Sequence, residues 1–119
     1  MATPPDARSL AERYLAMTEE DLFSLIPSHL PEYRETRFSP SGQVAAGRSF
    51  YERQLPTLHQ HVCVRWKYCE RRHDPDLKDT VTLVAAVADV IAASIGSAPP
   101  FVIAALLVKK SLNLVCGCA

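Results

Sequence analysis

Hydrophobic residues recur along this chain with the spacing of helices, and the densest apolar run lies at residues 80–116. The spacing of its bulky residues predicts one helix over about residues 79–95 and a second over about residues 100–115. Glycine and two prolines lie between them at residues 96–100, which predicts a turn. We therefore expect residues 80–116 to form an apolar helical hairpin.

The two arms of this hairpin differ in their hydrophobic pattern. The first has one bulky face and one face of small residues around Asp89, which would let another helix approach closely. The second is apolar on two sides, because Ile103 and Leu107 lie opposite a second row of hydrophobic residues. A helix with two apolar faces is either central in a bundle or covered by a second chain.

Shorter patterns precede the hairpin. Residues 1–5 are expected to be a disordered lead, and an apolar edge predicts a first helix over about residues 7–17. Thr18 is a typical N-cap residue for a second, short helix that should end at Pro27. The proline-rich residues 27–42 are expected to form an ordered loop.

The third predicted helix is the most amphipathic and runs over about residues 42–72. Its apolar stripe consists of Tyr51, Leu55, Leu58, Val62, Trp66 and Cys69. Pro56 lies on the polar side of this pattern, so it either bends one continuous helix or begins a second helix at its first position. The sequence thus predicts an all-α fold, a single domain over residues 1–119 built as a bundle of about five helices.

The composition is typical of a globular domain, and the overall charge does not point to a particular class of partner. Hydrophobic residues make up 48% and charged residues 22% of the 119 residues, and the 13 basic residues balance the 13 acidic ones. This balance argues against nucleic acid as a partner. One basic face is expected, formed by Arg65, Lys67, Arg71 and Arg72, and we interpret it as solvated or as facing an acidic partner.

The four cysteines could form two disulfides, but reduced, partly buried thiols fit an apolar core of this size better. Residues 1–10 lack the apolar segment of a secretory signal, so a cytoplasmic location is expected.

No arrangement typical of catalysis or metal binding is present in the sequence. His59 and Cys63 would share a helix face, as would Cys69 and His73, but the two pairs are about ten residues apart and point in different directions. The histidines have no paired carboxylate in an obvious position. We therefore expect no catalytic residue, no cofactor and no metal site.

The run from Trp66-Lys67-Tyr68-Cys69-Glu70 through the Val- and Ala-rich helix to residues 112–116 resembles small α-helical accessory proteins of bacterial defence systems. The resemblance covers roughly the C-terminal half. It implies an adaptor role, through helix packing against a larger partner or a second copy.

These patterns lead to the hypothesis of a non-enzymatic protein–protein interaction module. The expected contact residues are Asp89, Ile103, Leu107, Lys110 and Leu114. The alternative hypothesis is a membrane-active helical hairpin acting as a toxin or effector. Each arm is somewhat shorter than the roughly 20 apolar residues that a membrane span needs, which favours the first hypothesis.

Overall fold

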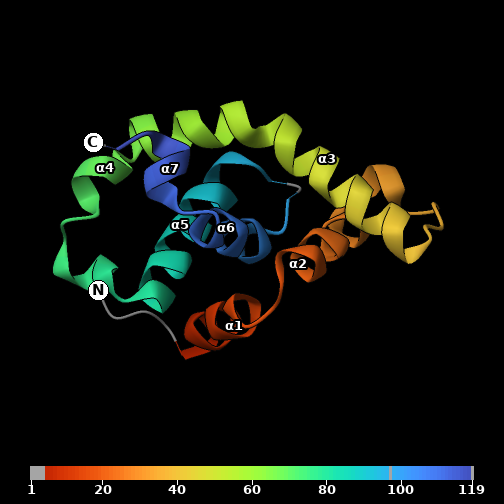
Figure 1. The fold of residues 1–119 in the computed structure, drawn as a ribbon, viewed down its shortest axis with the longest axis horizontal. Helices are drawn as coiled ribbons and strands as arrows, with labels where there is room; N and C mark the ends of the chain where they lie inside the picture. Colours follow the sequence, from red (N-terminus) through yellow and green to blue (C-terminus); the bar gives the residue numbers. More distant parts are fainter. Residues whose placement is uncertain (1–4, 97, 119) are drawn as a thin grey trace.

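The computed structural model describes residues 5–96 and 98–118 and confirms the all-α fold (Figure 1). The described residues form seven α-helices, one π-helix and three short 3-10 helices, and no strand. The bundle expected to have about five helices therefore has more segments, because two of the predicted helices are each broken.

The N-terminal helices follow local sequence signals closely. Helix α1 spans Pro5–Leu15, so it starts and ends about two residues earlier than expected. Helix α2 spans Glu19–Leu25, and the Asp21 N–H donates to the Thr18 hydroxyl over 3.1 Å, which is the predicted N-cap. The disordered lead expected at 1–5 lies outside the described residues except for Pro5, which begins α1.

The proline-rich segment is more helical than expected. It contains the 3-10 helices η1 (Pro27–His29) and η2 (Pro31–Tyr33), and α3 already begins at Pro40. Ser39 caps α3 by accepting a hydrogen bond from the Gly42 N–H over 3.1 Å.

Helix α3 (Pro40–Leu58) runs through Pro56, so the continuous alternative is correct. The predicted helix to residue 72 is nevertheless wrong at its end. A π-helix, η3 (His59–Arg65), follows α3, and Lys67 then adopts a left-handed conformation with φ 60°. This break turns the short α4 (Tyr68–Arg71) toward the C-terminus of the chain, and the 3-10 helix η4 (Pro75–Lys78) leads on to α5.

The apolar run 80–116 forms three helices. Helices α5 (Thr80–Ser94) and α6 (Pro100–Lys109) pack extensively against each other. The expected second arm is broken at Ser111, which has φ 71°, and α7 (Leu112–Cys116) follows. Gly117 ends α7 in the left-handed conformation that favours glycine, as its position after the apolar pattern predicts.

Helix α6 lies in the middle of the molecule (Figure 1), where it contacts α1, α2, α5 and α7. Its six consecutive residues from Val102 to Leu107 are all buried. Helix α2 in turn packs closely on α3, since a Cβ atom on Gly47 would lie 1.8 Å from the Phe23 carbonyl oxygen. Glycine is therefore required at that contact.

Candidate functional site

Two of the expected partner-contact residues are part of the core. Ile103 and Leu107 are both 0% exposed because neighbouring helices of the same chain cover both apolar faces of α6. Their assignment to a partner surface is wrong. The two-sided apolar pattern reflects a central helix.

The other three expected contact residues, Asp89, Lys110 and Leu114, lie at the surface on separate helices or helix ends. Asp89 is exposed on α5 and has no hydrogen bond or ion pair among the described residues. Lys110, which caps the end of α6, forms an ion pair with Glu19 over 2.7 Å. Leu114 on α7 is 79% exposed, so it alone of the apolar contact residues is available to a partner.

The expected reduced thiols are also a wrong prediction, because all four cysteines form disulfides. Cys63 pairs with Cys116, and Cys69 pairs with Cys118, with Cα–Cα distances of 5.3 and 5.4 Å. The turn at Lys67 places α4 beside α7, which brings the two pairs within bonding reach. The cross-links join the C-terminal segment to η3 and to α4.

Besides the disulfides, helix α7 contacts α4, α6 and the π-helix, and Val115 packs against the core. Leu112 is buried, whereas Asn113 lies at the surface and accepts hydrogen bonds from the Tyr68 hydroxyl over 3.1 Å and from Arg72 over 3.2 Å. A helix of five residues is not stable by itself in water. The disulfides therefore carry much of its positioning.

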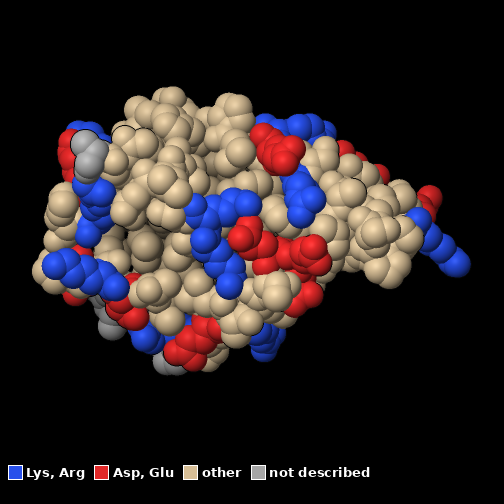
Figure 2. All heavy atoms as spheres, in the orientation of Figure 1, with Lys and Arg blue, Asp and Glu red and all other residues tan. Residues whose placement is uncertain are grey.

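Two exposed hydrophobic residues lie close in sequence to the cross-linked cysteines. Leu114 and Val64, which is 49% exposed, are the large exposed hydrophobic residues of the described chain, and they flank the Cys63–Cys116 bridge in sequence. Figure 2 shows an area without charged side chains over α7 and the adjoining end of α3. We call the surface around Leu114 and Val64 the α7 face.

Beside the α7 face lies a groove with a volume of about 490 Å³. It is lined by residues from α2, α3, the π-helix and the C-terminal segment: Phe23, Arg48, Tyr51, Glu52, Leu55, Pro56, His59, Lys110 and Val115. We call it the Phe23 groove. Two cations lie over the Phe23 ring, with Arg48 Cζ 5.1 Å and Lys110 Nζ 5.6 Å from its centroid.

Tyr51 lines this groove and is 2% exposed. Its hydroxyl is the one buried side-chain nitrogen or oxygen in residues 6–96 and 98–118 without a hydrogen-bond partner. Burial, together with the negative charge of Glu19, raises the pKa of Tyr51 to about 12. The hydroxyl therefore stays protonated at neutral pH and is a hydrogen-bond donor.

The basic face expected from the sequence is largely engaged in holding the chain. The Arg71 Nε donates to the Trp66 carbonyl, and the Arg71 guanidinium lies 5.4 Å from the Trp66 ring centroid. Arg72 donates to Cys69 and Asn113, while Arg65 and Lys67 are exposed. Two of the four cations thus stabilise the turn that orients α4.

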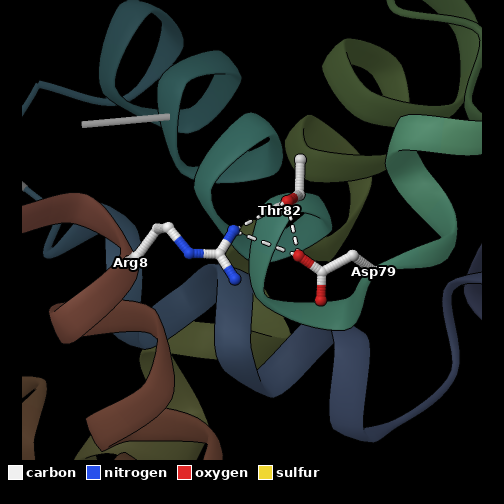
Figure 3. Close-up of polar contacts among 3 residues, drawn as sticks. All are labelled: Arg8, Asp79 and Thr82. Carbon is white, nitrogen blue, oxygen red and sulfur yellow. Dashed lines mark hydrogen bonds and ion pairs between the residues drawn. The ribbon is translucent and has the colours of Figure 1, made fainter. Parts of the chain in front are cut away.

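A second polar cluster ties α1 to the start of α5 (Figure 3). Arg8 Nη1 lies 3.1 Å from both Asp79 Oδ2 and Thr82 Oγ1, and Thr82 donates to Asp79 over 2.7 Å. The Thr82 hydrogen bond, followed by the one from Arg8, lowers the pKa of Asp79. A carboxylate so stabilised is a weak base, so we assign the cluster a structural role.

The histidine- and cysteine-containing segment does not gather metal ligands. Cys63 and Cys69 are in disulfides and cannot act as thiolates. Among the residues that the structure describes, no group of three or more His, Cys, Asp or Glu side chains is placed to hold a metal ion. Within the same residues, no helix has the length and apolarity needed to cross a membrane.

Comparisons of this chain with protein-family models, with curated proteins and with solved structures find no match. Functional assignment therefore depends on the surface features described above. Four cysteines were recognised in the sequence as able to form two disulfides, but the apolar core was given more weight, and the position of Tyr51, one turn after Arg48 on the same helix, was missed.

Proposed function

We propose that this protein is a non-enzymatic interaction module that binds another polypeptide through the α7 face. The observation that carries the proposal is Leu114, a leucine 79% exposed on a helix cross-linked to the rest of the fold. Exposed leucines are common singly, but here the surface over α7 carries no charged side chains (Figure 2), and Val64, next to the bridging Cys63, is also exposed.

Covalent positioning supports a binding role. A segment that is already ordered loses little conformational entropy when a partner binds, so more of the contact energy appears as affinity. The two disulfides supply that order at α7. Disulfides persist in oxidising compartments, so they favour such a compartment over the cytoplasmic location expected from the sequence.

The nature of the partner follows from the chemistry of the α7 face. The exposed side chains of Leu114 and Val64 suit a complementary apolar surface on another protein. The resemblance of residues 66–116 to accessory proteins of bacterial defence systems makes an effector of such a system the first partner to test. A second copy of this chain is the other, because the net charge of zero gives no repulsion between copies.

The alternative, a membrane-active hairpin, has less support. It would have to expose α6, whose six central residues fill the core. Liposome flotation separates the two hypotheses, since the interaction module is expected to remain unbound.

Site-specific photo-crosslinking tests the interaction proposal. A benzophenone amino acid replaces Leu114 in the oxidised protein, and the same amino acid at the exposed Ala45 on α3 is the control. We expect a discrete cross-linked product from position 114 only, formed in cells of the native host or with purified protein at high concentration. Val64→Asp should abolish it, because that change adds charge to the α7 face and leaves the probe in place.

A product containing two copies of this chain indicates self-association, and one containing a different protein indicates an adaptor. The proposal is overturned if position 114 gives no more product than position 45, or if Val64→Asp leaves the product unchanged.

A further inference from the structure

The Phe23 groove has an electrostatic feature that packing does not explain. Arg48 and Lys110 both lie over the ring of Phe23, so two positive charges border the groove. Glu19 pairs with Lys110 over 2.7 Å. Arg48 has no hydrogen bond or ion pair with any described residue.

Other charged groups around the groove do not neutralise Arg48. Glu52 lies one helical turn further along α3 and lines the groove, yet it forms no ion pair with Arg48. His59 also lines the groove and carries no acidic partner. An unpaired guanidinium beside a low-dielectric wall attracts an anion, and its planar donors match a carboxylate.

Tyr51 adds an independent observation. Its buried hydroxyl lacks the acceptor that buried hydroxyls almost always have. Such a group in a native fold calls for an explanation, and a ligand that supplies the acceptor is one. Tyr51 lies three residues after Arg48 on α3, so the two residues are about one turn apart on the helix and both line the groove.

The rest of the lining is apolar. Leu55 and Pro56 come from α3, and Val115 comes from the cross-linked α7. The volume of about 490 Å³ lies within the range of roughly 300–1,000 Å³ found for sites of small ligands.

We propose that the Phe23 groove binds a small amphipathic carboxylate, with its alkyl or aryl body against Leu55, Pro56 and Val115 and its carboxylate held by Arg48 and the Tyr51 hydroxyl. This function is separate from the polypeptide contact proposed for Leu114, although Val115 brings α7 to the edge of the groove. An acid of this class is a fatty acid of medium chain length or an aromatic acid.

Titrations monitored by ¹H–¹⁵N spectra test this site with three probes that share one alkyl chain: octanoate, octanol and octylammonium. Octanoate should shift the amide signals of the groove residues and bind at least about tenfold more tightly than octylammonium, because only the carboxylate complements Arg48. Octanol should bind with intermediate affinity through the apolar wall alone.

Two variants test the assigned contacts. Arg48→Gln should weaken octanoate binding about fivefold or more and leave octanol unchanged, because it removes the charge-assisted contact. Tyr51→Phe should weaken octanoate about threefold or more without reducing stability, since the hydroxyl has no partner in the unliganded fold.

Arg53→Gln is the matched control. Arg53 is on the same helix, is exposed, and stacks on Phe50 at 5.9 Å, but it does not line the groove. It should leave octanoate affinity unchanged. The proposal is overturned if octanoate gives no localised shifts up to about 10 mM, if octylammonium binds as tightly, or if Arg53→Gln weakens octanoate as much as Arg48→Gln.

Discussion

Helices α6 and α7 are neighbours in sequence and similarly apolar, yet they lie in opposite environments. Six consecutive side chains of α6 are buried by four surrounding helices, whereas α7 buries Leu112 and exposes Leu114. Packing alone holds α6, whereas two disulfides hold α7 in addition to the packing of Leu112 and Val115. The difference indicates that hydrophobic texture does not decide whether a segment is core or contact surface. In this protein a segment is part of the core where other helices of the same chain cover it, and it is surface where they do not.

Removing both disulfides is expected to have the largest effect and tests whether the cross-links hold α7. The bridges span 53 and 49 residues, and replacing all four cysteines by serine should lower the free energy of unfolding by roughly 4–6 kcal/mol. Urea denaturation with circular dichroism measures it. In the Cys69→Ser, Cys118→Ser variant the loss should be only about 2–3 kcal/mol, because the remaining bridge already closes the long loop. An unchanged midpoint after full reduction would contradict the role assigned to the cross-links.

A substitution in α6 tests the claim that core packing holds this helix. Leu106 is 0% exposed, so Leu106→Ala removes buried surface and leaves a cavity among the surrounding helices. The free energy of unfolding should fall by roughly 2–5 kcal/mol. Urea denaturation of the oxidised protein measures the loss, and a change below about 0.5 kcal/mol would show that α6 is not tightly packed.

The same substitution in α7 should have a much smaller effect. Leu114→Ala changes a side chain that is already solvated, so the free energy of unfolding should stay within about 0.5 kcal/mol of the wild type. Partner binding should nevertheless weaken, which analytical ultracentrifugation or the affinity for the cross-linked partner would report. A loss of stability comparable to that of Leu106→Ala would mean that Leu114 packs on the core.

The smallest expected effect concerns the polar tie between α1 and α5, which is exposed and held neither by core packing nor by cross-links. Since the folded pKa of Asp79 is lowered, its ionised form stabilises the fold above the unfolded pKa of about 3.9, and this contribution disappears as pH falls through the folded pKa. Asp79→Asn should therefore be slightly less stable than the wild type near neutral pH and equal to it in strong acid. Asp76→Asn, at a nearby exposed carboxylate, is the control and should be as stable as the wild type near neutral pH.

Local signals in the sequence predicted much of the fold. The Thr18 cap, the end of α2 before Pro27 and the Gly117 cap each depend on one residue and its immediate neighbours, so they could be identified without tertiary information. The helical period likewise gave α5, whereas at Pro56 it left two alternatives open, of which the structure has the continuous helix.

The helix breaks, the cysteine pairing and the groove could not be predicted from local sequence signals. Lys67 and Ser111 adopt positive φ angles although neither residue type favours them, so only the tertiary fold reveals the turns. The pairing of four cysteines has three solutions that spacing does not distinguish. The Phe23 groove combines α2, α3 and the C-terminal segment, and its unpaired groups become apparent only when these elements are assembled.

Backbone order parameters of the oxidised and reduced protein test the central claim most directly, namely that α7 is positioned by its cross-links and α6 by burial. In the oxidised protein, residues 102–107 and 112–116 should both have order parameters near about 0.85. After reduction, residues 112–116 should fall below about 0.6 while residues 102–107 keep their value. Unchanged order at residues 112–116 in the reduced protein would contradict the account.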